Sequence, residues 1–143
     1  YPYFTQIERN DSNFTLKTGL PPWQLSEYTK QAHYGLMLHR FDRTLVSSLH
    51  YQSIVPSKLF TYLELGLPVI VSSETSAVSD IVRDNGIGIV VEYNQIKHLK
   101  EIVNSEHTRY NEYIDNVKRF REANDMQTNL IKASKRTKLQ PNR

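Results

Sequence analysis

Three residues near the middle of the chain have the types and the spacing of an anion-binding helix start. Ser57 and Lys58 directly follow Pro56, and an apolar periodicity begins at Leu59. Ser is a favoured N-cap residue, and the unpaired amide groups of a helix N-terminus attract anions. Lys58 would add a positive charge, and Tyr62, on the same helix face, would offer a ring to a base or a hydroxyl to a phosphate. The segment predicts a phosphate site, although the spacing also suits an ordinary helix start whose lysine points into water.

Strand and helix patterns alternate around this segment. Strands are predicted at 13–18, 34–38, 68–72 and 88–92, and helices at 20–32, 57–65, 76–84 and 95–103. Strands that are joined by one helix each must be parallel, with right-handed crossovers. We therefore expect an α/β fold, a doubly wound parallel sheet of the Rossmann-like type, with its ligand at the carboxyl ends of the strands. The polar stretch 39–55 is the longest predicted loop, and loops of this length are often functional.

A long helix and a basic tail are expected after the last strand. Apolar residues recur at helical spacing from Tyr110 to Phe120, which predicts a helix from His107 to about Lys135. We accordingly predict a Rossmann-like domain over residues 1–106, and a C-terminal helix with a basic tail over 107–143. The chain from Thr128 onward holds five Lys or Arg residues and no acidic one, so the net charge of +3 leaves −2 for the remainder. The folded part is therefore not a basic nucleic-acid-binding body, and the tail is expected to be solvated or weakly attracted to an anionic membrane.

Composition excludes several other kinds of site. The chain has 143 residues and no cysteine, which excludes disulfides, thiolate metal sites and cysteine nucleophiles. Its apolar runs are too short to span a bilayer. The five histidines show no paired spacing with carboxylates, so we expect no metal site. Four acidic residues also lack a fixed spacing and are interpreted as solvated charges: Glu64, Glu74, Asp80 and Asp84. The chain begins with Tyr1 rather than Met, and we expect it to be part of a longer protein.

The run from Pro56 to Val91 resembles the C-terminal, nucleotide-sugar-binding domain of GT-B-type glycosyltransferases. In that family the pattern P-x-K-x-x-x-Y-x-x-x-G-x-P-V-I forms the helix and strand that bind the diphosphate of the sugar donor. The matching positions are Pro56, Lys58, Tyr62, Gly66, Pro68, Val69 and Ile70. The segment from Thr18 to Leu38 is similar to the family's preceding βαβ unit. The sequence of this run most resembles bacterial galactofuranosyl- and glucosyltransferase-like proteins that modify cell-surface glycans.

The resemblance implies roles for individual residues. Lys58 and Tyr62 would bind the diphosphate at the helix start, together with Ser57. Arg40, which follows the strand at 34–38, would assist them, and Gly19 would belong to the same nucleotide-sugar site. GT-B enzymes typically use the helix dipole and cationic side chains to stabilise the leaving group. We therefore expect neither a metal nor another cofactor.

The chain departs from the family pattern at two positions. Many such transferases carry a glutamate that holds the donor ribose, and a second glutamate eight residues before it. The corresponding residues here are Thr61 and Ser53. The expected ribose contact therefore lacks its carboxylate.

These features predict the donor-binding domain of a glycosyltransferase. It would transfer a sugar from an NDP-sugar, most simply a UDP-sugar, to a glycan or lipid-linked acceptor. The acceptor site and any catalytic base would belong to an N-terminal domain or partner chain, so no catalytic residue is assigned. We expect a cytoplasmic location, with the basic tail near the inner face of the membrane. The alternative is a non-catalytic GT-B-like partner or docking module, which uses the helix after His107 as its interface.

Overall fold

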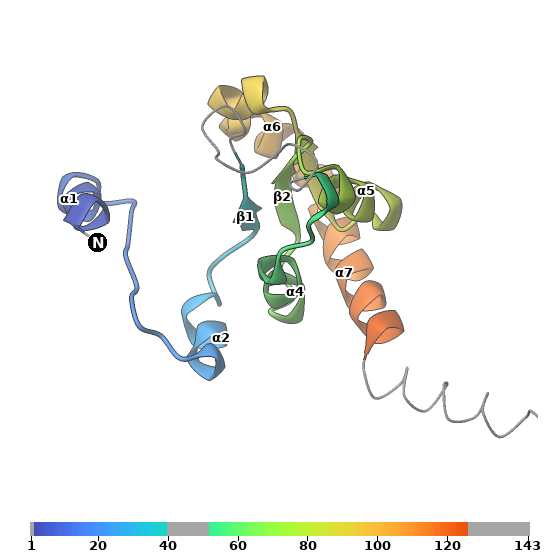
Figure 1. Cartoon of the computed structure of the whole chain (residues 1–143), viewed down its shortest axis with the longest axis horizontal. Coiled ribbons are helices and arrows are strands. Elements are labelled where there is room, and N and C mark those ends of the chain that lie inside the picture. Colours follow the sequence, from blue (N-terminus) through green and yellow to red (C-terminus); the bar gives the residue numbers. More distant parts are fainter. Residues whose placement is uncertain (1, 40–51, 126–143) are drawn as a thin grey trace, which may run out of the picture. The chain divides into compact units, whose positions relative to one another are not determined.

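The structure, a computed structural model, describes residues 2–39 and 52–125 (Figure 1). The chain divides between Gln31 and Ala32 into two compact units. None of the helices in the described ranges is long and apolar enough to cross a bilayer.

The first unit consists of short helices and an extended connection. Its elements are α1 (Pro2–Asn10), the 3-10 helix η1 (Pro22–Gln24) and α2 (Leu25–Tyr28). The predicted strand at 13–18 is wrong, because the Leu16 amide donates a hydrogen bond to the Glu8 carboxylate, at 2.7 Å, and not to a neighbouring strand. The predicted helix at 20–32 is shorter than expected. Its end at Thr29 is marked by a side-chain hydroxyl that donates to the Leu25 carbonyl at 2.9 Å.

The second unit contains the alternating elements. In chain order these are β1 (Gly35–Met37), α4 (Ser57–Glu64), β2 (Val69–Ser72), α5 (Ser76–Asn85), β3 (Gly88–Val91), η3 (Tyr93–His98), α6 (Leu99–Ser105), η4 (His107–Arg109) and α7 (Tyr110–Asn124). The strands predicted at 34–38, 68–72 and 88–92 and the helices predicted at 57–65 and 76–84 are thus confirmed. The helix predicted at 95–103 begins as a 3-10 helix and becomes α-helical at Leu99.

The three strands form one parallel sheet in the order β1-β2-β3. Gly35 is in register with Val69, and Val69 with Gly88. A Cβ on Gly88 would lie 1.9 Å from the Val69 carbonyl oxygen, so only glycine allows this close strand pairing. The mixed α/β fold with a parallel sheet is confirmed, on a smaller scale than the four strands predicted.

Helices cover both faces of this sheet, because successive strand residues point to opposite sides. On one face Val69 and Val71 lie in a core with Leu59 and Leu63 of α4, and with the buried valines of α5, Val78 and Val82. On the other face Ile70, Ile89 and Val91 pack against partly buried residues of η3 and α6, namely Ile96, Leu99, Ile102 and Val103. The spacing of four residues within α4 and within α5 places both pairs on one helix face.

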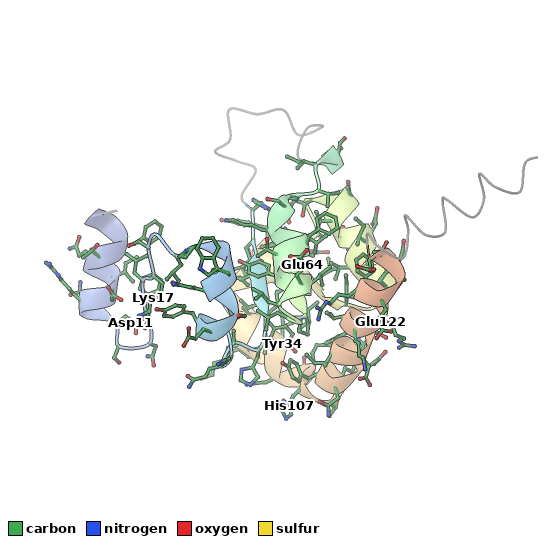
Figure 2. All side chains as sticks on the ribbon, turned by 90° about the horizontal axis from the view of Figure 1, so that it is seen from below. Asp11, Lys17, Tyr34, Glu64, His107 and Glu122 are labelled. Carbon is green, nitrogen blue, oxygen red and sulfur yellow. The ribbon has the colours of Figure 1, made fainter. Side chains whose placement is uncertain are left out.

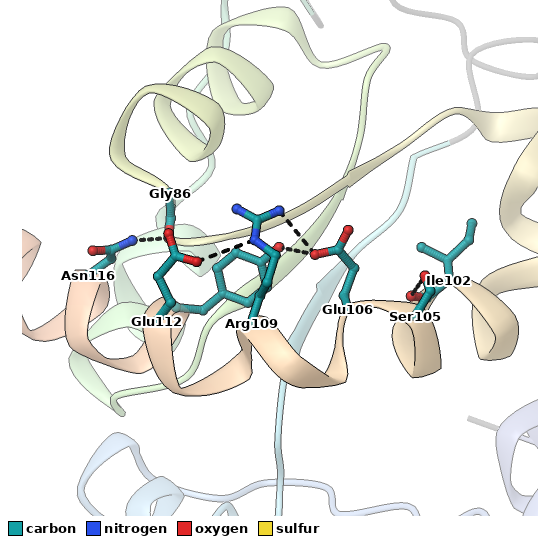
Figure 3. Close-up of polar contacts among 8 residues, drawn as sticks. Gly86, Ile102, Ser105, Glu106, Arg109, Glu112 and Asn116 are labelled. Atoms are coloured by element: carbon teal, nitrogen blue, oxygen red, sulfur yellow. Dashed lines mark hydrogen bonds and ion pairs between the residues drawn. The ribbon is translucent and has the colours of Figure 1, made fainter.

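Helix α7 contributes to the cores on both faces of the sheet. Tyr113 is buried in the core on the α6 side, and Val117 is buried in the core on the α4 and α5 side. The Asn116 side-chain amide also donates to the Gly86 carbonyl at 2.8 Å, where α5 ends in a left-handed glycine (Figure 3). The predicted helix from His107 is confirmed as η4 and α7 up to Asn124, and its predicted extension to Lys135 lies outside the described residues. The division into domains at residue 107 stays a prediction.

Candidate functional site

The loops at the carboxyl ends of the three strands are joined by hydrogen bonds. The His39 amide, after β1, donates to the Ser72 hydroxyl at 3.2 Å. The Ser73 amide, after β2, donates to the Val91 carbonyl at 2.9 Å. The Tyr93 amide, after β3, donates to a carboxylate oxygen of Glu74 at 3.0 Å. This edge of the sheet is therefore one connected surface, and it is the edge at which the ligand was predicted.

The start of α4 differs from the prediction by one residue. Pro56, with extended backbone angles (φ −64, ψ 143), is the N-cap, and Ser57 is the first helical residue. The prediction that Ser57 caps the helix is wrong, because the extended proline takes the cap position, and no side chain of the described residues caps this end. Within the described part of the chain the amides of Ser57 and Lys58 have no acceptor. Two amide groups with a positive partial charge are thus left for an anion.

Lys58 lies on the surface in the first turn of α4. Its ammonium group forms no ion pair or hydrogen bond with the residues that the structure describes. A lysine in the first turn is mildly unfavourable next to the positive end of the helix. A bound anion would remove this repulsion.

Tyr62 contacts β1. A Cβ on Gly35 would lie 2.2 Å from the Cγ atom of Tyr62, so the tyrosine ring lies directly on the glycine. The Tyr62 hydroxyl donates to the Leu36 carbonyl at 3.4 Å. The ring is half-buried, so Tyr62 holds α4 against β1 and has part of its surface left for a ligand.

The chain before α4 also contacts the start of α5. The Ser76 hydroxyl donates to the Gln52 carbonyl at 3.1 Å. Thr75 is buried, and its hydroxyl donates to the Ser72 carbonyl at 2.9 Å, which closes the turn between β2 and α5. The Ser76–Gln52 hydrogen bond brings the segment that leads into α4 to the carboxyl edge of the sheet.

Glu74 is not the solvated charge that the sequence suggested. One of its carboxylate oxygens, Oε1, accepts the Tyr93 amide, and the other, Oε2, is buried without a hydrogen-bond partner among the described residues. Its position two residues after a fully buried strand was the signal in the sequence that could have identified it.

The structure does not test the roles of two further predicted site residues. Arg40 lies outside the described residues. Gly19 belongs to the first unit, where it has a φ of 67° and where an added Cβ would meet nothing within 4 Å. Their roles in the site stay predictions. In the described ranges no group of three or more His, Asp or Glu side chains could hold a metal ion.

A second polar cluster connects α6 to α7 (Figure 3). The Tyr113 hydroxyl donates to the Glu106 carboxylate at 2.5 Å, and Arg109 pairs with Glu106 at 3.1 Å and with Glu112 at 3.3 Å. Burial, and then the hydrogen bond to Glu106, raises the pKa of the Tyr113 hydroxyl well above the ordinary value of a tyrosine. The Arg109 guanidinium also lies over the Tyr113 ring, at 5.0 Å from its centroid. This cluster fixes the direction in which α7 leaves α6.

Two further tyrosines connect α7 to the chain before β1. The rings of Tyr34 and Tyr110 meet edge to face at 5.3 Å, and the Tyr110 hydroxyl donates to the His33 carbonyl at 3.3 Å. Burial raises the pKa of both tyrosines. Since Tyr34 precedes β1, these contacts lie at the amino ends of the strands, away from the predicted ligand site.

A groove of about 610 Å³ lies between α4 and the end of α7. Glu64 on α4 and Glu122 on α7 are among the residues that line it (Figure 2). An eight-residue helix is about 12 Å long. From α4 the groove is lined by Phe60, Leu63 and Glu64, and Lys58 in the first turn does not line it.

Comparison with known proteins identifies the family. No curated protein and no solved structure matches the chain significantly. The family model of the glucosyltransferase 3-like, C-terminal domain matches residues 3–134. That match covers most of the chain, both units included. The protein therefore belongs to the family of glucosyltransferase 3-like C-terminal domains.

Proposed function

We propose that this chain is the donor-binding domain of a glycosyltransferase and that it holds the diphosphate of an NDP-sugar at the start of α4. The observation that carries the proposal is the exposed Lys58 beside the Ser57 and Lys58 amides, all three without a partner among residues 2–39 and 52–125. The carboxyl edge of a parallel sheet is where α/β folds bind their ligands. The family membership supports a role in glycosyl transfer.

The same groups would assist the chemical step. When the sugar leaves the donor, negative charge develops on the nucleoside diphosphate. The helix N-terminus and Lys58 would stabilise that charge, because both carry positive charge at the start of α4. This chemistry requires no metal ion. The GT-B type, a UDP-sugar as donor and a glycan or lipid-linked acceptor are part of the proposal and rest on the sequence resemblance.

Nucleotide titration tests the proposal. We expect UDP to bind the parent chain in a calorimetric titration, and Lys58→Ala to weaken binding by about 10- to 100-fold, since a hydrogen bond to a charged group contributes about 1.5–3 kcal/mol. Lys118→Ala is the matched control, because it removes the same charge from the exposed face of α7. Equal affinity in the two variants would contradict the site, and the absence of binding at millimolar UDP would contradict the function.

The alternative function is a non-catalytic partner module. It is favoured by the exposure of Phe60 (48%) at the groove between α4 and α7, where an apolar side chain faces solvent. A stable complex with a second chain, in which neither the parent chain nor the complex binds UDP, would support this function over donor binding.

A further inference from the structure

We propose that Glu74 accepts a hydrogen bond from a hydroxyl group of the bound sugar nucleotide. The inference rests on the proposed function and adds a second contact to it. The relevant hydroxyls belong to the ribose or to the donor sugar, and both present the same chemistry to a carboxylate. Glu74 would thereby recognise the sugar part of the ligand, and Lys58 would recognise the diphosphate.

The two oxygens of the Glu74 carboxylate have different surroundings. Oε1 accepts the Tyr93 amide at 3.0 Å, which fixes the side chain between the loops that follow β2 and β3. Oε2 has no donor among the described residues, although it is buried. Buried polar atoms are nearly always hydrogen-bonded, and exceptions in native proteins are often functional. A ligand hydroxyl that donates to Oε2 would supply this hydrogen bond.

The position of Glu74 agrees with this role. β2 is the central strand, and Glu74 follows its carboxyl end by two residues. The next turn leads to Ser76, which contacts Gln52 in the segment before α4. Glu74 and the start of α4 therefore belong to the same edge of the sheet, and a single extended ligand is expected to meet both.

A small rotation of the side chain would bring the carboxylate to the ligand. Glu74 as a whole is only partly buried. The terminal torsion of a glutamate is broad, so the carboxylate can turn without leaving its rotamer. One oxygen would keep the Tyr93 amide while the other meets the hydroxyl.

The experiment compares Glu74→Gln with Glu64→Gln in the full chain. Glutamine has nearly the same shape, and its amide oxygen still accepts the Tyr93 amide, but it replaces the second carboxylate oxygen by a donor. Glu64, exposed at the end of α4, controls for the loss of one negative charge. The probes are UDP and UDP-glucose in calorimetric titrations, and the ligand-free midpoint of thermal unfolding is measured for each variant.

We expect Glu74→Gln to weaken binding about tenfold. A loss confined to UDP-glucose assigns the hydroxyl to the donor sugar, and an equal loss for UDP assigns it to the ribose. The unfolding midpoint should be unchanged or higher, because the substitution removes the negative charge of a carboxylate whose Oε2 is buried and has no donor among the described residues. Affinities within twofold of the Glu64→Gln control, or a lowered midpoint with parental affinities, would overturn the inference.

The variants also separate this inference from the proposed function. If Lys58→Ala abolishes binding while Glu74→Gln does not, the proposed function stands and only this inference fails. A parent chain that binds neither probe overturns both.

Discussion

Tyr62 and Gly35 form a close contact between α4 and the sheet. The tyrosine ring occupies the space in which a side chain on Gly35 would lie, with its Cγ atom 2.2 Å from an added Cβ. The Tyr62 hydroxyl extends the contact to the Leu36 carbonyl. The residue that the family pattern assigns to the diphosphate thus also positions the helix that carries Lys58.

We therefore expect Gly35→Ala to lower the free energy of unfolding by about 1–3 kcal/mol, the usual cost of overpacking. Gly88→Ala should cost more, because its Cβ would meet the Val69 backbone at 1.9 Å, and a backbone in the central strand cannot move aside as a side chain can. Gly66→Ala is the reference for strain alone, since it has open space and a φ of 77°. Its cost should be about 1–2 kcal/mol. Urea unfolding measures all three, and a Gly88→Ala variant that is milder than Gly66→Ala would contradict the close strand pairing.

At the residue scale the sequence predicted the positions of individual side chains better than the contacts between them. The exposed lysine at the helix start was expected from the spacing around Lys58. The ring of Tyr62 on Gly35 was not, because two residues so far apart in the chain are brought together only by the crossover from β1 to α4. The hydrogen bond of Glu74 Oε1 was missed for the same reason, since the amide that donates to it comes from the loop after the next strand.

At the scale of elements the junction of α6 and α7 depends on one short hydrogen bond. Tyr113 donates to Glu106, and Arg109 balances the charge of that carboxylate. The raised pKa means that the folded chain keeps the Tyr113 proton at a pH at which the unfolded chain releases it. The stabilisation is thus fully present below about pH 10, the ordinary tyrosine value, and is lost as pH rises toward the folded pKa.

Tyr113→Phe tests this linkage. We expect the variant to lower the free energy of unfolding by about 1–3 kcal/mol at neutral pH, because the hydrogen bond to a charged acceptor is lost. It should also lose less stability than the parent when the pH is raised from about 9 to 11. Tyr28→Phe, at an exposed tyrosine, is the control. Urea unfolding at several pH values gives both quantities, and parallel pH profiles of parent and Tyr113→Phe would contradict the role of the phenol.

Elements with a buried partner were predicted well, and elements without one were not. The runs at 34–38, 68–72 and 88–92 are strongly apolar, and each finds a neighbouring strand. Asn13–Thr18 also alternates apolar and polar residues, but a strand exists only when another strand accepts its amides, and Glu8 accepts that of Leu16. The helix Pro2–Asn10 was not predicted. Its apolar residues are few, and the sequence signal for a short helix is correspondingly weak.

For the whole molecule the two hydrophobic cores explain where the stable part lies. Every residue of both cores comes from the chain after Ala32. α7 contributes to both of them through Tyr113 and Val117. The candidate ligand edge therefore rests on a unit with its own core.

The sequential order of the strands also has a consequence for folding kinetics. Pairing of β2 with β3 closes a loop of 19 residues (88 less 69), and pairing of β1 with β2 closes one of 34 (69 less 35). The longer loop costs about 0.5 kcal/mol more in chain entropy. We therefore expect β2, α5 and β3 to form the nucleus, with α4 and β1 docking afterwards.

Stopped-flow folding of two truncations in the same core tests this order. Val82→Ala in α5 should slow folding, whereas Leu63→Ala in α4 should mainly accelerate unfolding. The opposite assignment would contradict it. If the order holds, the helix that carries Lys58 docks only after β2, α5 and β3 have formed. A nucleotide bound at its start would then stabilise the native state chiefly by slowing the detachment of α4.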